Sequence, residues 1–234
     1  ADPRVVGLVL VGSTANQSHA PDAWSDHDFF AVTESGVQEQ FRTQFDWLPD
    51  HENIVLTVRE TEHGLKILYQ SGHLLECAIF DLDEIGLAKV NDYKVAFDRG
   101  DVTERVERIA VPNAILAPSP ASIQRDLGMV LCLLLVGAGR VKRGEAISGQ
   151  VFIRSHAVSH LLTLLAHHLP SDNKATLDNL DPFRRFEQVF PEVGQQINAA
   201  LSREPIAAAL GLLAVYEAYL SDSDGYPAQA VEAV

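Results

Sequence analysis

The pattern of apolar residues changes once along the chain, and this change constrains the fold more than any other feature. Before Pro112 the sequence consists of short β-rich runs, such as Val5–Val11, that end at turn-forming residues. After Pro120 the long apolar patterns have helical spacing. We therefore predict an α+β chain, with a mixed sheet and flanking helices over residues 1–117 and an all-helical bundle over residues 118–234.

The individual elements follow from the same patterns. We expect the helices of the first half to lie on one side of its sheet, and Ser71-Gly72 favours a hairpin turn between two of its strands. Pro191 is expected to break or kink one helix of the second half. The expected strands are Val5–Val11, Asp28–Val32, Ile54–Val58, Leu65–Tyr69, Leu74–Phe80 and Lys94–Phe97; the expected helices are Val37–Trp47, 120–143, 149–169, 181–202 and 205–220.

Charge is the unusual part of the composition. The chain has 18 Lys and Arg residues against 32 Asp and Glu residues, so its formal net charge is −14. Such a field repels duplex nucleic acid, whose binding proteins usually carry a basic surface. It attracts a cationic small molecule, although acidity is equally a route to solubility. We therefore expect no nucleic acid duplex among the partners.

The two cysteines and the apolar runs bear on where the chain works. Cys77 and Cys132 each lie in an apolar run, which predicts buried free thiols and a cytoplasmic protein. The longest apolar stretch, Met129–Ala138, is shorter than the roughly 20 residues that a membrane-spanning helix needs. No export signal is visible at the N-terminus. We therefore expect no membrane partner.

Two aspartates stand at the start of the second predicted strand. Asp26 and Asp28 are two residues apart, so in extended backbone their side chains share a face, about 7 Å apart along the strand. His27 between them points to the opposite face. Two carboxylates this close repel one another unless a cation lies between them. Mg²⁺, which prefers oxygen ligands, suits such a pair.

Gly12 and Ser13 follow the first predicted strand. A glycine lets the backbone approach a phosphate closely, and the Ser13 hydroxyl can donate a hydrogen bond to a phosphate oxygen. A triphosphate held by metal on one side and by these donors on the other is set up for in-line attack at its α-phosphorus.

Gly-Ser, a spacer of about a dozen residues and then Asp-x-Asp resemble the signature of the DNA polymerase β-like nucleotidyltransferase superfamily. The two-part layout looks like that of the small nucleotidyltransferases that modify aminoglycoside or lincosamide antibiotics. The resemblance implies that Gly12 and Ser13 bind an NTP, with ATP expected, and that Asp26 and Asp28 hold Mg²⁺. The implied reaction transfers a nucleoside monophosphate to a hydroxyl of a small acceptor such as these antibiotics, and the acidic net charge favours a cationic acceptor.

The resemblance also implies a third carboxylate on a neighbouring strand, and Glu76 in the run LLECAIFD matches that position. The family usually has aspartate there. Glu76 is therefore either a third metal ligand or the general base that accepts the proton of the acceptor hydroxyl. Lys142 and Arg143 either reach the triphosphate from the helical half or only complement a helix C-terminus.

Several alternatives stay open at this level. A minimal nucleotidyltransferase of a toxin–antitoxin pair, which acts on or binds a protein partner, has a similar pattern, as has an inactive nucleotide sensor. Arg154, His156 and His160 in the helical half are interpreted as structural residues. The sequence leaves the acceptor and the oligomeric state undecided, a homodimer included.

Overall fold

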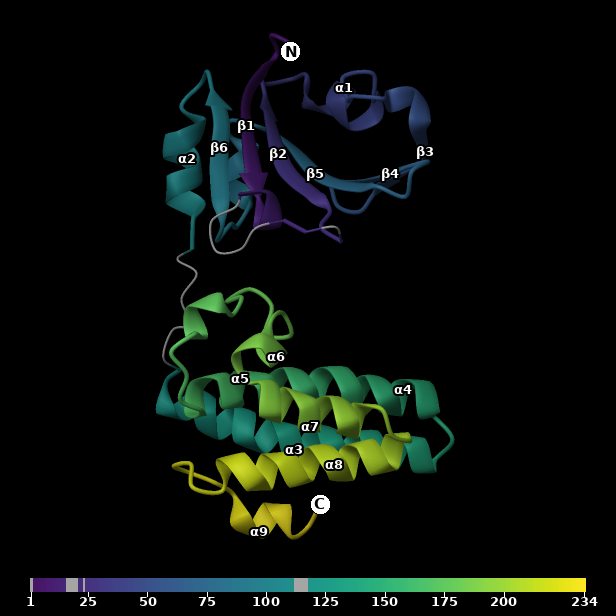
Figure 1. Cartoon of the computed structure of the whole chain (residues 1–234), viewed down its shortest axis with the longest axis vertical. Helices are drawn as coiled ribbons and strands as arrows, with labels where there is room; N and C mark the ends of the chain where they lie inside the picture. The colour runs from purple at the N-terminus through teal and green to yellow at the C-terminus, as the bar shows by residue number, and fades with distance from the viewer. Residues whose placement is uncertain (1, 16–20, 23, 112–117) are drawn as a thin grey trace. The chain divides into compact units, whose positions relative to one another are not determined.

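The chain is described here by a computed structural model that covers residues 2–15, 21–22, 24–111 and 118–234. It divides into two compact units, Ala1–Asn113 and Ala114–Val234, and each is described by itself (Figure 1). The first unit contains a six-stranded mixed sheet with flanking helices, and the described part of the second is helical. The predicted α+β fold class is confirmed.

The sheet has the strand order β3-β4-β5-β2-β1-β6. Strands β2 and β5 are parallel, and the other neighbouring pairs are antiparallel. The predicted hairpin joins β4 to β5, with Gly72 at a positive φ of 85° in the turn. The strands are β1 (Val5–Val11), β2 (His27–Thr33), β3 (Ile54–Arg59), β4 (Gly64–Tyr69), β5 (Leu74–Asp81) and β6 (Tyr93–Asp98).

Helices cover both faces of this sheet. Ala31 of β2 packs in one apolar cluster with Phe41 of helix α1 (Gln38–Thr43). The next residue, Val32, packs in a second cluster with Val106 of helix α2 (Val102–Ile109). Because successive residues of a strand point to opposite faces, α1 and α2 lie on opposite sides of the sheet, as Figure 1 shows.

Two predictions for the first unit were therefore wrong. The helices do not lie on one side of the sheet, because α2, which the sequence analysis did not predict, covers the second face. Its apolar residues are few and stand among charged ones, so the run reads as polar. Helix α1 also ends at Thr43, earlier than predicted, and Trp47 packs beyond its end against Phe41, at 5.7 Å between ring centroids.

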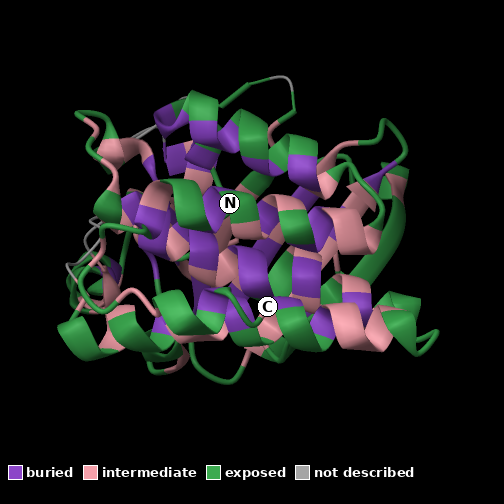
Figure 2. Cartoon of the chain, turned by 90° about the horizontal axis from the view of Figure 1, so that it is seen from below, coloured by how far each residue is buried: buried purple, intermediate pink, exposed green. Residues whose placement is uncertain are grey.

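The second unit is built from long helices around one apolar core. Figure 2 shows buried and exposed residues alternating along them, as expected of helices that pack on one face. The helices are α3 (Pro120–Lys142), α4 (Ala146–Val151), a π-helical turn (Phe152–Ala157), α5 (Val158–His168), α6 (Phe186–Val189), α7 (Pro191–Leu201), α8 (Pro205–Leu220) and α9 (Ala228–Val231).

Pro191 accounts for one difference from the predicted helices. The predicted helix 181–202 is two helices, α6 and α7, and Pro191 is the first residue of α7. Proline is well tolerated there because the first N–H groups of a helix have no partner within it. The chain before Phe186 is not helical, so the prediction was wrong for residues 181–185.

Helix α3 carries apolar residues on its exposed side as well as on its buried side. Cys77 of β5 is buried as predicted, whereas Cys132 of α3 is exposed, so that prediction was wrong. Leu135 beside it is 51% exposed. By length and composition alone, α3 could cross a membrane. Its buried residues, Leu127 and Leu134 among them, pack in the core of the second unit.

Candidate metal centre

Three carboxylates converge on one face of the first unit's sheet. Asp26, Asp28 and Glu76 each offer a carboxylate oxygen, and these three atoms lie within 4.8 Å of one another. All three residues are half-buried. Three acidic groups at this separation form a set of oxygen ligands of the kind that a hard divalent cation prefers.

Strand register explains why these residues meet. Asp28 of β2 and Glu76 of β5 are direct partners across the parallel pair. Neighbouring strands lie about 4.8 Å apart, so residues at the same level project side by side from one face. Asp26 comes just before β2, which begins at His27, so the aspartate pair spans the strand's start and does not lie wholly within the strand.

Gly12 sits directly against the Asp28 carboxylate. It begins a 3₁₀ turn, Gly12–Ala15, that follows β1, and its φ is +58°. A Cβ atom at this position would lie 3.0 Å from Asp28 Oδ2. Both the left-handed backbone and the close approach favour glycine here. Thr14 ties the turn to β2, because its Oγ1 lies 2.7 Å from the carbonyl oxygen of Asp28.

Ser13 carries a buried hydroxyl with unused hydrogen-bonding capacity. The residue is 7% exposed, and its Oγ has no hydrogen-bond partner among the described residues. Burying a hydroxyl without a partner costs about 1–3 kcal/mol in proteins. The turn beside the carboxylates therefore holds a donor that a ligand oxygen can satisfy.

Lys66 is also part of this cluster, although it was not among the predicted site residues. It is the direct partner of Glu76 across the antiparallel strands β4 and β5. Its Nζ lies 2.6 Å from Glu76 Oε1 and 3.5 Å from Glu60 Oε2. The hydrogen bond to Glu76 raises the pKa of Lys66 and outweighs the opposing effect of burial. The hairpin turn at Ser71-Gly72 fixes this register, so the turn was the signal that would have paired the two residues.

Asp28 and Glu76 line a pocket on this face of the sheet. Its volume is about 220 Å³, and its lining includes Val11, Asp28, Glu60 and Glu76. His27 belongs to the other face of the sheet, where its Nδ1 lies 2.7 Å from His73 Nε2. The histidine of the Asp-His-Asp run thus contacts another histidine on the face of the sheet that lies opposite the carboxylates.

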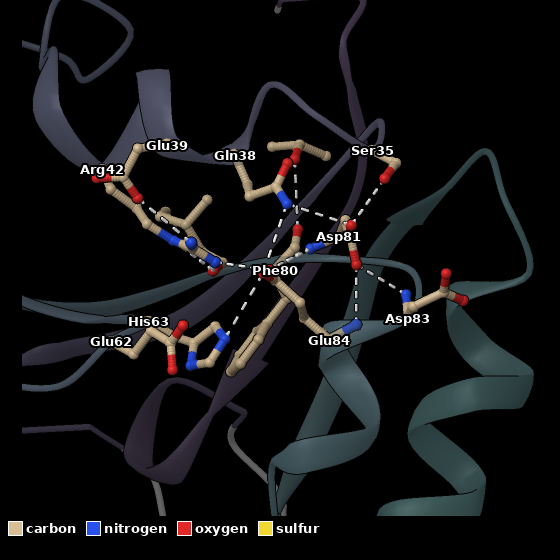
Figure 3. Close-up of polar contacts among 12 residues, drawn as sticks. Ser35, Gln38, Glu39, Arg42, Glu62, His63, Phe80, Asp81, Asp83 and Glu84 are labelled. Carbon is tan, nitrogen blue, oxygen red and sulfur yellow. Dashed lines mark hydrogen bonds and ion pairs between the residues drawn. The ribbon is translucent and has the colours of Figure 1, made fainter.

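A separate polar network lies at the far end of β5 and anchors α1 (Figure 3). Arg42, almost fully buried, donates to the carbonyl oxygen of Ile79 at 2.6 Å and to Glu84 Oε2 at 2.6 Å. Burial raises the pKa of Asp81, but hydrogen bonds from the Glu84 N–H and the Ser35 hydroxyl lower it overall. These contacts join α1 to β5 and to Glu84, which indicates a structural role for the network.

Two of the residues of the second unit that were interpreted as structural, Arg154 and His160, have partners within that unit. Arg154 donates to the carbonyl oxygens of Leu201 and, at 2.6 Å, of Arg203, where α7 ends. His160 Nδ1 lies 3.1 Å from Asp126 Oδ1. These contacts agree with the structural interpretation of Arg154 and His160.

Lys142 ends helix α3, and Arg143 follows it. Both are exposed, and Arg143 Nε lies 3.4 Å from Glu145 Oε1. That Lys142 and Arg143 contact a triphosphate stays a prediction.

Comparison with known proteins finds a distant likeness among solved structures. No known protein family matches the chain, and neither does any curated protein. Among solved structures, the chain is similar to the crystal structure of an aminoglycoside 6-adenyltransferase from Bacillus subtilis. The identity is 12% and the TM-score 0.41, over 99% of this chain and 85% of that chain. A TM-score of this size does not establish a shared function. The function proposed below is therefore argued from the residues of the site.

Proposed function

We propose that the chain is a metal-dependent nucleotidyltransferase that transfers AMP from ATP to a hydroxyl of a small acceptor. The observation that supports this most strongly is the convergence of Asp26, Asp28 and Glu76, with ligand oxygens within 4.8 Å of one another. Carboxylates this close repel one another, and Mg²⁺ compensates that repulsion while keeping phosphate oxygens as further ligands. The three residues thus fit the ion that the proposed reaction requires.

Gly12 and Ser13 support the phosphate half of the proposal. A side chain at Gly12 would fill the space beside Asp28, and the Ser13 hydroxyl has no hydrogen-bond partner among the described residues. A phosphate oxygen would satisfy that hydroxyl. Lys142 and Arg143 of the helical unit are proposed to contact the same triphosphate, with residues 118–234 contributing the acceptor-binding domain.

The proposed chemistry is in-line displacement at the α-phosphorus. The acceptor oxygen forms a new bond to phosphorus, the bond to the bridging oxygen breaks, and pyrophosphate leaves with that oxygen. Bound Mg²⁺ supplies charge neutralisation at the transferred phosphoryl group. Ser13 donates to a phosphate oxygen, while Asp26 and Asp28 hold the metal. Glu76 either completes that ligand set or accepts the proton of the acceptor hydroxyl.

The class of acceptor is proposed from the sequence. The resemblance to antibiotic-modifying enzymes points to an aminoglycoside or a lincosamide, and the proposed biological role is antibiotic resistance. A net charge of −14 favours the polycationic aminoglycosides, because it attracts cations to the protein surface.

A pyrophosphate-release assay tests the proposal. The wild-type chain is incubated with ATP, Mg²⁺ and a panel of aminoglycosides and lincosamides, in parallel with Asp28→Asn. We expect release with at least one acceptor and a loss of about 100-fold or more in the variant. Asp83→Asn is the matched control, because the side chain of Asp83 is 91% exposed and lies at the far end of β5. Wild-type transfer by Asp28→Asn would contradict the mechanism.

A further inference from the structure

Lys66, Glu76 and Asp28 form a row across three neighbouring strands. Lys66 of β4 pairs with Glu76 of β5 in the antiparallel register, and Glu76 pairs with Asp28 of β2 in the parallel register. Residues at one level of a sheet project from the same face. The ammonium and the two carboxylates therefore stand side by side, with Glu76 in the middle.

Glu76 is shared between two positions that attract cations. On one side, the Lys66 ammonium bridges Glu76 Oε1, at 2.6 Å, and Glu60 Oε2, at 3.5 Å. On the other side, the carboxylates of Asp28 and Asp26 lie within 4.8 Å of that of Glu76. One oxygen of Glu76 is thus bonded to an internal cation, beside the place proposed for a divalent ion.

We propose that Lys66 is a positioning residue that holds Glu76 by one carboxylate oxygen and competes with the divalent cation for that carboxylate. This inference rests on the proposed metal site. A fixed positive charge next to the ligand set repels a divalent ion, so the cluster binds the ion weakly by itself. Binding becomes tight when a triphosphate brings additional negative charge. Lys66 thereby keeps the affinity for the ion low in the absence of a nucleotide.

Removal of the charge at position 66 should strengthen metal binding in the absence of nucleotide. We expect Lys66→Met to bind Mn²⁺ about tenfold more tightly than the wild-type chain, since a nearby repelling charge has been removed. Lys66→Thr should give the same increase, and threonine suits a strand position. Lys66→Arg keeps the charge and should leave the affinity within about twofold of wild type.

Lys94→Met provides the matched control. Lys94 of β6 pairs with Leu10 of β1, which pairs with Phe29 of β2, so it lies on the face opposite Asp28. The same charge is removed from the same sheet, and the Mn²⁺ affinity should not change. If Lys66 had only a structural role, its substitution would leave the Mn²⁺ affinity unchanged or weaken it. An increase in the Mn²⁺ affinity therefore indicates competition.

The affinities are measured by titrating the full chain with Mn²⁺ in the absence of nucleotide. Electron paramagnetic resonance reports the concentration of free Mn²⁺ at each step. The inference is supported if the wild-type chain binds Mn²⁺ and if Lys66→Met and Lys66→Thr, but neither Lys66→Arg nor Lys94→Met, bind it about tenfold more tightly. Unchanged or weaker binding in these folded variants overturns it and leaves the proposed function standing. A wild-type chain that binds no Mn²⁺, even with ATP present, overturns the proposed metal site and the inference together.

Discussion

Asp28 and Glu76 occupy the same level of the parallel strands β2 and β5, so their carboxylates leave the sheet side by side on one face. With Asp26 they place three ligand oxygens within 4.8 Å of one another. Such a concentration of negative charge is unfavourable without a compensating cation. Lys66 pairs with Glu76, and the convergence of the three carboxylates is the physical basis for proposing a divalent metal at this position.

Glu76→Gln should weaken metal binding because it removes one of the three charged ligands. We expect the Mn²⁺ affinity and the rate of transfer each to fall by at least about tenfold, as ligand-shell changes commonly do. Calorimetric titration with Mn²⁺ and the pyrophosphate assay measure the two effects. An unchanged affinity in a folded variant would show that Glu76 is not a ligand and would favour its alternative role as the general base.

Gly12→Ala should damage both the backbone and the site. Alanine at a φ of +58° costs about 1–2 kcal/mol, and its Cβ would lie 3.0 Å from Asp28 Oδ2. We expect a lower melting temperature together with a loss of transfer of at least about tenfold. Gly72→Ala is the matched control, since Gly72 also has a positive φ, 85°, but a Cβ there would have nothing within 4 Å. This control should lose stability and retain transfer; equal activity in both variants would contradict the role of Gly12.

Ser13→Ala separates binding from stability. The Ser13 hydroxyl has no hydrogen-bond partner among the described residues, so its removal breaks no bond there. We expect the free energy of unfolding to stay the same or rise by up to about 1 kcal/mol. If the hydroxyl donates to a phosphate, the rate of transfer should fall about 100-fold. Urea denaturation and steady-state kinetics measure the two quantities, and a destabilised but fully active variant would refute this assignment.

Arg42→Met should destabilise the first unit without affecting the metal site. The Arg42 side chain is 5% exposed and is bonded to Glu84 and to the carbonyl oxygen of Ile79. Breaking a buried ion pair by removing one partner typically costs about 3–5 kcal/mol. Urea denaturation should show a loss of this order, while the Mn²⁺ affinity of the folded variant should equal that of wild type. A change in affinity would mean that this network supports the site.

The hydrogen bonds to Asp98 should make the free energy of unfolding of the first unit depend on pH. Hydrogen bonds from the Thr103 side chain and from the N–H groups of Thr103, Gly100 and Val102 hold the pKa of Asp98 well below its usual range. A lowered pKa contributes stability above the unfolded-state pKa, near about 3.9, and that stability is lost as the pH falls further. Asp98→Asn should therefore be less stable than wild type at neutral pH, with a smaller difference at pH values below about 3. Urea denaturation across this range measures the difference, and a constant difference would contradict the assignment.

The central features of the site were predictable because they depend on local spacing. Asp26 and Asp28 are two residues apart at the start of β2, and Gly12 and Ser13 follow an apolar strand directly. Glu76 was identified only through the resemblance to a family, since the parallel pairing of β2 with β5 joins residues far apart in the sequence. Pairings of this kind leave no local pattern.

Other features could not be predicted for different physical reasons. The turn at Ser71-Gly72 signals the pairing of Lys66 with Glu76, but the place of Lys66 beside Asp28 depends on the long-range pairing of β5 with β2, which leaves no local pattern. Half of the residues of helix α2 are charged, and its apolar residues, Val102, Val106 and Ile109, form a stripe of only two turns, which is too short to identify a helix by pattern alone. Cys132 lies in an apolar run of α3 whose residues are divided between the core and the surface, and its exposure depends on which helices pack around α3.

The most direct test of the proposed metal centre is a crystal structure with Mn²⁺ and a non-hydrolysable ATP analogue, measured for anomalous scattering at the manganese edge. We predict an anomalous peak between Asp26, Asp28 and Glu76, with carboxylate oxygens at about 2.0–2.3 Å and a phosphate oxygen completing the ligand set. A nucleotide bound in the crystal with no manganese among these three residues would contradict the account.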